Sequence, residues 1–144
     1  MTGVIIDKNS KLEISHHYGI KDFYRYGICM LTIVNTTYCK KLIFMFNKQK
    51  HPAQFHKKKQ ETFFILFGKI KLVITKKNKV KFTSILIAGD IVTLSQYDIH
   101  EFQCVSKNGS VIEELSTTSI NNDSFYLDNK INKNNSRKSF ISLK

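Results

Sequence analysis

The feature that most constrains the fold is a succession of short segments that are rich in β-branched and aromatic residues. No long stretch carries the 3.6-residue apolar period of an amphipathic helix, and Pro52 is the only proline. Turn-forming residues separate the segments, a pattern typical of an all-β sandwich or barrel. The expected strands span residues 27–34, 41–46, 62–67, 69–75, 80–86, 90–94, 100–105 and 110–115.

Alternating lysines and apolar residues support these strands. Within 69–74 and 79–82 the lysines fall on one face of an extended chain and the apolar residues largely on the other. Between these runs, Lys76-Lys77-Asn78 predicts a hairpin in which Asn78 takes the left-handed conformation of a tight turn. Asn108-Gly109 predicts a second hairpin.

The length of the chain, 144 residues, fits one domain, and the sequence contains no repeat or linker that would divide it. We expect residues 1–128 to form a single β-barrel. From Asn121 on, the sequence is polar and rich in Asn, Lys and Ser, so residues 129–144 are predicted to be a flexible tail.

The formal net charge of +12 raises the question of a nucleic-acid partner. The lysines are scattered over turns and polar strand faces, which favours a solvated surface over a concentrated binding patch. A nucleic-acid-binding barrel would also need exposed aromatic residues beside the lysines. We expect the aromatic residues of the strands to lie in the core, which disfavours that function; they are Phe63, Phe67, Phe82 and Phe102.

The cysteines and the hydropathy pattern indicate a cellular compartment. Cys29, Cys39 and Cys104 are odd in number and lack the C-x-x-C spacing, so they predict a reducing environment without disulfides. The amino terminus has no signal-peptide core, and no window approaches the ~20 apolar residues of a membrane span. We therefore expect a cytoplasmic protein without a membrane partner.

Four polar residues have the spacing of a metal site. Gln54 and His56 are two apart and share a face of a strand, while Glu61 begins the next strand on a face with Phe63. A further donor, His100, begins a later strand. Imidazole and carboxylate ligands in a partly open site suit a divalent zinc, iron, manganese, nickel or cobalt ion.

These residues resemble the two sequence motifs of the cupin superfamily. Residues 54–68, with Glu61 and a closing Gly68, look like the first motif, and residues 89–104 look like the second. The resemblance implies a single jelly-roll β-barrel with Gln54, His56, Glu61 and His100 as metal ligands. Gln54 stands where the family usually has His. Further departures are Ser95 and Tyr97 in place of proline and glycine, and Cys104 in place of asparagine.

A narrower resemblance runs from about Ser15 to Asp128. The segments 15–19, 38–41, 51–52, 57–63, 113–118 and 123–128 look like the cupin module attached to some sialic-acid-synthase-like proteins. This resemblance implies a role in bacterial nonulosonic-acid or surface-sugar pathways. The resemblance supports this pathway more directly than it supports a particular reaction, since no synthase barrel precedes the module in this sequence.

Other polar residues are candidates for proton transfer or substrate contact. His16 and His17 face opposite ways on an extended chain, so one of them could point into a pocket. His51, which precedes Pro52, could lie at the pocket rim. Glu113 and Glu114 also face opposite ways, and an inward glutamate needs a metal, a lysine or a substrate hydroxyl as partner.

Two functions remain open from the sequence. The first is a metal-dependent sugar isomerase or epimerase, in which Glu113, Glu114, His16 or His17 moves a proton. The second is a non-catalytic module that binds a sugar or sugar acid and assists a synthase. Residues 42–46 and 63–67 are apolar on both faces, so we also expect a homodimer.

Overall fold

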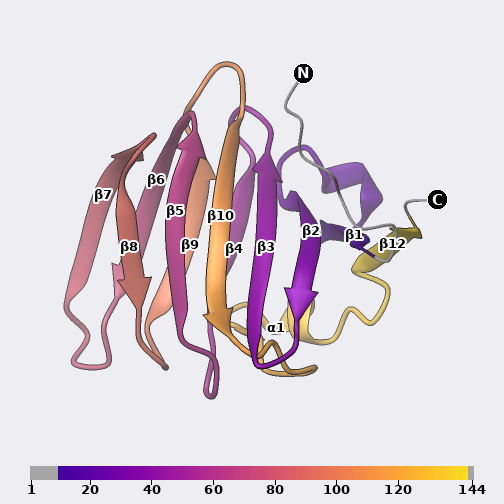
Figure 1. The fold of residues 1–144 in the computed structure, drawn as a ribbon. Helices are drawn as coiled ribbons and strands as arrows, with labels where there is room; N and C mark the ends of the chain where they lie inside the picture. The colour runs from indigo at the N-terminus through magenta and orange to yellow at the C-terminus, as the bar shows by residue number, and fades with distance from the viewer. Residues whose placement is uncertain (1–9, 143–144) are drawn as a thin grey trace.

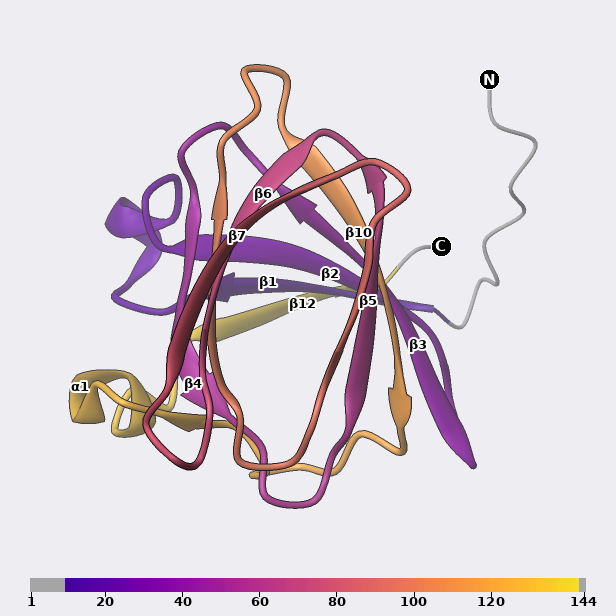
Figure 2. The same cartoon turned by 90° about the vertical axis from the view of Figure 1, so that its left-hand side faces the viewer.

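Residues 10–142 are described by the computed structural model, and they form two antiparallel β-sheets. Figures 1 and 2 show the sheets facing each other as two layers, with the short helix α1 (Asn129–Asn132) outside the strands. The all-β architecture expected from the sequence is confirmed. Within this part of the chain, no helix is long and apolar enough to cross a membrane.

The larger sheet has seven strands in the order β12-β1-β2-β3-β10-β5-β8. A short 3-10 segment, η1 (Ile20–Asp22), follows its first strand in the sequence. The strands are β1 (Lys11–His16), β2 (Gly27–Asn35), β3 (Tyr38–Met45), β5 (Glu61–Phe67), β8 (Ile91–Leu94), β10 (Ser110–Thr117) and β12 (Lys138–Ser142).

The smaller sheet has five strands in the order β11-β4-β9-β6-β7. Gln54 and His100 are directly paired across β4 and β9, so the register itself brings these two predicted ligands side by side. The strands are β4 (Lys50–Phe55), β6 (Lys69–Thr75), β7 (Lys81–Ile87), β9 (Ile99–Cys104) and β11 (Phe125–Tyr126).

The core lies between the two sheets and comes from the inward residues of alternating strands. Phe63 and Ile65 on β5 share the buried face with Glu61, and Phe102 and Cys104 on β9 share it with His100. These face assignments agree with the two-residue period seen in the sequence. The remaining members of the cluster are Ile28, Ile43, Met45, Ile70, Leu72, Leu94 and Ile112.

The predicted hairpin between β6 and β7 is present, but its left-handed residue is Lys79 and not Asn78. Asn78 instead accepts a hydrogen bond from the backbone N–H of Val80 through its side-chain oxygen, 3.2 Å away. An Asn side chain that bonds two residues ahead replaces a backbone turn contact. The positive φ therefore falls on the following lysine.

Asn108-Gly109 forms a turn but not the predicted hairpin. The strands that it joins belong to different sheets, since β9 pairs with β4 and β6 whereas β10 pairs with β3 and β5. Gly109 has a φ of 82°, and an added Cβ would lie 2.8 Å from the carbonyl oxygen of Met45. An Asn-Gly turn thus marks a crossing between sheets here.

The C-terminal segment, which we expected to be a flexible tail, forms α1 and the strand β12 as far as Ser142. Strand β12 pairs with β1 over residues 11–15 and extends the larger sheet. Its side chains are exposed, so a polar composition is compatible with an edge strand whose backbone hydrogen bonds are satisfied on one side. Composition alone does not distinguish such a strand from a tail.

Two of the four aromatic residues expected in the core are exposed. Phe63 and Phe102 are buried, but Phe67 at the end of β5 and Phe82 on β7 are about half exposed. Strand β7 is the edge of the smaller sheet, and nearly all of its side chains face solvent. An alternating pattern identifies a strand, but it does not identify which strand lies at the edge.

Candidate functional site

The structure brings together three of the predicted metal ligands between the two sheets. His56 lies just past β4, Glu61 begins β5, and His100 lies on β9. One ligand atom from each residue can be chosen so that all three lie within 4.8 Å of one another. The Nε2 atoms of His56 and His100 are 3.3 Å and 3.5 Å from the two carboxylate oxygens of Glu61.

Backbone carbonyls orient both imidazoles. The Nδ1 atom of His56 is 2.7 Å from the carbonyl oxygen of Asp123, and that of His100 is 3.2 Å from the carbonyl oxygen of Asp98. A carbonyl only accepts, so each Nδ1 donates, and in a neutral imidazole the Nε2 then presents its lone pair toward Glu61. Acceptor atoms thus converge on acceptor atoms, an arrangement that a bound cation stabilises.

Gln54 completes the group of predicted ligands. Its Nε2 is 3.4 Å from the Nε2 of His100, and its Oε1 is buried without a hydrogen-bond partner in the described chain. Buried polar atoms without a partner are rare in proteins. The orphaned amide oxygen and the converging lone pairs fit a divalent ion held by the four predicted residues.

The pKa values favour the forms that bind metal. Burial would raise the pKa of Glu61, but the Lys59 ammonium beside it holds that pKa well below its usual range. Burial lowers the pKa of His100, although the neighbouring Glu61 carboxylate opposes that shift. An ionised carboxylate and a neutral imidazole are the protonation states that metal coordination requires.

Asp123 fixes the turn that carries His56 into β5. Its carboxylate accepts hydrogen bonds from the backbone N–H groups of Lys57, Lys58 and Lys59, at 3.0 to 3.2 Å. The same residue accepts from His56 through its carbonyl oxygen. A segment far away in the sequence therefore sets both the turn geometry and the imidazole orientation.

Lys59 is the main residue of the site that sequence reasoning missed, because the lysines as a group were expected on a solvated surface. Its side chain is only 6% exposed and its Nζ lies 2.6 Å from Glu61 and 2.9 Å from Glu114. Burial would lower the pKa of Lys59, but the two carboxylates raise it above its usual value, so Lys59 is protonated. The two-residue spacing from Glu61 was the available signal.

The two adjacent glutamates have different environments, as their alternation implied. Glu114 points inward, where Lys59 and Lys41 are its cationic partners and Ser116 donates a hydrogen bond at 3.2 Å. Glu113 points outward and pairs with Lys40 at 2.6 Å. The inward glutamate thus meets lysines, one of the partners expected for it, and Glu113 does not reach the cluster.

His16 and His17 are both buried, and neither lines the pockets described below. His16 lies 3.1 Å from the hydroxyl of Ser139 on β12. His17 packs edge-on against His51, with 4.9 Å between the ring centroids, and contacts Tyr126. Burial, followed by the positive charge of Arg137, lowers the pKa of His17 to about 3.

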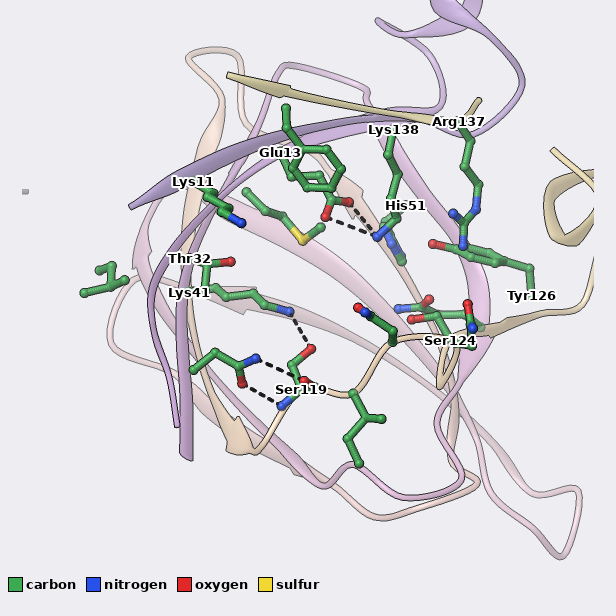
Figure 3. Close-up of a pocket in the computed structure, with 18 residues that line it drawn as sticks. Lys11, Glu13, Thr32, Lys41, His51, Ser119, Ser124, Tyr126, Arg137 and Lys138 are labelled. Carbon is green, nitrogen blue, oxygen red and sulfur yellow. Dashed lines mark hydrogen bonds and ion pairs between the residues drawn. The ribbon is translucent and has the colours of Figure 1, made fainter. Parts of the chain in front are cut away.

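A pocket of about 720 Å³ opens beside the cluster. Figure 3 shows His51, Tyr126 and Arg137 grouped on one wall and Lys41 with Ser119 on another. His51 and Gln54 also line a smaller space of about 30 Å³, whose walls include Glu61, His100 and Glu114. That inner space is about the size of one water molecule or ion, and it adjoins the large pocket at His51 and Gln54.

Among the comparisons with known proteins, only the comparison with solved structures finds similar proteins. No protein-family model matches the sequence, and no curated protein is significantly similar to it. The narrower resemblance to cupin modules of sialic-acid-synthase-like proteins therefore stays a prediction.

Solved structures do resemble the chain. The capsular polysaccharide assembling protein CapF of Staphylococcus aureus gives a TM-score of 0.64 at 12% identity, over 70% of this chain and 30% of CapF. A protein of Klebsiella pneumoniae with a double-stranded β-helix domain gives a TM-score of 0.60 at 13% identity, over 70% of this chain and 84% of that protein. The Cnp3 cupin domain of Schizosaccharomyces pombe gives a TM-score of 0.56 at 13% identity, over 64% of this chain and 65% of that domain. The chain therefore has the cupin fold, the double-stranded β-helix jelly roll that the motifs predicted.

Proposed function

We propose that this chain is a metal-binding cupin that acts on a sugar or sugar acid in nonulosonic-acid or surface-polysaccharide metabolism, as an isomerase or epimerase. The observation that carries the proposal is the convergence of His56, Glu61 and His100, beside Gln54, which also lines a large pocket. A polysaccharide context is supported by the motifs and by the likeness to CapF, whose description names capsular polysaccharide assembly.

The charge of the pocket favours an anionic ligand. Lys11, Lys41, Arg137 and Lys138 line it, and its one carboxylate, that of Glu13, is paired with Lys138 at 2.9 Å. In the described chain, the Arg137 side chain has no hydrogen bond or ion pair. Its guanidinium carbon lies over the Tyr126 ring, 5.4 Å from the ring centroid. A guanidinium with free donors binds a carboxylate in a bidentate manner.

The residues around the pocket suggest how a proton would be moved. A divalent ion held by Gln54, His56, Glu61 and His100 would polarise a carbonyl group of the ligand. His51 lines both spaces, its buried Nδ1 has no partner in the described residues, and burial keeps its pKa well below the usual value. A neutral imidazole in this place can accept a proton from the ligand.

The alternative function is a module that binds a sugar acid without turnover. One observation favours it: the inward carboxylate Glu114 is already paired with two lysines, which lower its pKa against the effect of burial. Glu114 is therefore a weak base, and in the described residues the Nδ1 of His51 has no hydrogen-bond partner. Turnover would then depend on His51 alone.

Replacement of Arg137 by Met is expected to weaken binding of a sugar acid at least about tenfold, because one charged bidentate contact is worth more than ~1.4 kcal/mol. Isothermal titration with N-acetylneuraminate as the probe, and N-acetylmannosamine as its neutral counterpart, measures this difference. Lys107→Met removes an exposed charge away from the pocket and serves as the control. Equal binding of the acid to wild-type protein and Arg137→Met would contradict the anionic subsite.

The same titration samples distinguish the two functions. Exchange of a carbon-bound ligand proton with deuterium from heavy water, followed by nuclear magnetic resonance, reports proton abstraction by the enzyme. Exchange that requires added metal and is lost in His51→Gln supports the isomerase or epimerase. Saturable binding without exchange supports the binding module.

We further propose that two copies pair through the outer face of the larger sheet. Neighbouring strands β3, β10 and β5 expose Phe44, Leu115 and Leu66 there, at 36%, 49% and 42%. Apolar side chains that share one exposed sheet face are typical of an interface. Sedimentation equilibrium at micromolar concentration is expected to give twice the 16.7 kDa chain mass, and a monomer would contradict this pairing.

A further inference from the structure

We propose that Lys59 is a built-in cation that shares the Glu61 carboxylate with the metal and so limits how tightly the centre binds it. This inference rests on the proposed metal centre. It concerns a residue outside the motif ligands, since nothing in the two motifs requires a lysine at this position. Its consequence is measurable with the metal alone, without knowledge of the substrate.

The geometry places the ammonium on a ligand atom. The Nζ of Lys59 lies 2.6 Å from Oε1 of Glu61, and the Nε2 of His56 lies 3.3 Å from that same oxygen. The other oxygen, Oε2, faces His100 at 3.5 Å. A metal ion that binds Glu61 must therefore accept a positive charge on the same carboxylate, or displace that charge.

The backbone of Lys59 is held in its turn, and its side chain is enclosed away from solvent. Its backbone N–H donates to the Asp123 carboxylate at 3.0 Å, and its side chain is 6% exposed. Glu61 and Glu114 are each 3% exposed. Like charges at short range in such a poorly screened place repel each other more strongly than they would at the surface.

The charge balance supports the same conclusion. Lys41, Lys59, Glu61 and Glu114 form a buried network with two positive and two negative groups, so its formal charge is zero before any metal binds. A centre built only of Gln54, Glu61 and neutral histidines would carry one negative charge. Lys59 thus removes the electrostatic attraction for a divalent ion, while Glu114 gives the ammonium a second carboxylate to which it can shift.

Replacement of Lys59 by Met tests the inference directly. Met retains much of the side-chain length and removes the charge, so the Kd for Zn²⁺ or Mn²⁺ is expected to fall at least tenfold, measured by isothermal titration of untagged protein. Lys58→Met is the matched control, since Lys58 is exposed in the same turn, and its Kd is expected to change less than twofold. All five histidines are buried, so surface imidazoles do not contribute to the titration.

The variant Lys59→Met/Glu114→Gln covers the case in which Lys59→Met does not fold. It removes the ammonium together with its second carboxylate, and circular dichroism verifies the fold of each protein. The network of this variant stays neutral, but Oε1 of Glu61 no longer carries the ammonium, so the variant is expected to bind the metal more tightly than the wild type and less tightly than Lys59→Met.

The outcomes separate the inference from the metal centre itself. Tighter metal binding without Lys59 supports the inference. Unchanged or weaker binding in these variants, with metal still bound by the wild type, overturns the inference and leaves the centre standing, because Lys59 would then only position Glu61. No metal bound by any of the proteins overturns both.

Discussion

Replacing Glu114 by Leu is expected to lower the free energy of unfolding by about 3–5 kcal/mol, because the change leaves one carboxylate to balance two lysines in the interior. Lys59 would keep Glu61 as its single partner, and Lys41, whose side chain is 12% exposed, would lose its contact at 3.6 Å. Ser116 would also lose the acceptor of its hydroxyl. Urea unfolding followed by circular dichroism measures the loss.

The adjacent residue gives a matched control. Glu113→Leu changes the same side chain one position away, where the carboxylate pairs with Lys40 at the surface. Exposed ion pairs contribute about 0–1 kcal/mol to stability, so the free energy of unfolding of this variant is expected to stay close to that of the wild type. Equal destabilisation by both changes would show that the buried network is not the source of the effect.

Much of the fold was predictable because the two-residue period of a strand decides which side chains meet. The faces of Glu61 with Phe63 and of His100 with Phe102 came from this period alone, and both are confirmed by burial. The positions of Gly68 and Gly89 also agree with the turns that end strands, since both have positive φ values, 82° and 98°. Local rules were sufficient at these positions.

The connections between strands were less predictable because pairing depends on segments far apart in the sequence. Asn108-Gly109 has the composition of a hairpin, yet its flanking strands pair with β3 and β5 on one side and with β4 and β6 on the other. Strand β12 was equally difficult to predict, because its partner β1 lies at the opposite end of the sequence. Neither local composition nor periodicity reports such partners.

At the candidate site, too, some features follow from local spacing and others only from the fold. The spacing of Gln54, His56, Glu61 and His100 suggested a cluster, and the structure places their side chains together. Lys59 was expected at the surface with the other lysines, because their scattered positions favour solvation. Only the fold shows that its side chain points inward between Glu61 and Glu114, where its charge has partners. A buried charge is predicted by its partners and not by its own residue type.

His100→Ala is the change with the largest expected effect on metal binding. His100 is 1% exposed, its Nδ1 is held by the carbonyl of Asp98, and its Nε2 faces Glu61. Even groups that only orient metal ligands change the affinity by about 10–100-fold, so loss of a ligand itself is expected to cost at least ~100-fold. His16→Ala is the control, since His16 is buried but lies outside both pockets.

The most direct measurement is equilibrium dialysis of untagged protein against each of zinc, iron, manganese, nickel and cobalt, followed by elemental analysis. For at least one of these ions, we expect about one metal ion per chain in the wild type and in His16→Ala, and no metal above background in His100→Ala. No bound metal in the wild type, or equal metal in all three proteins, would contradict the metal centre formed by Gln54, His56, Glu61 and His100.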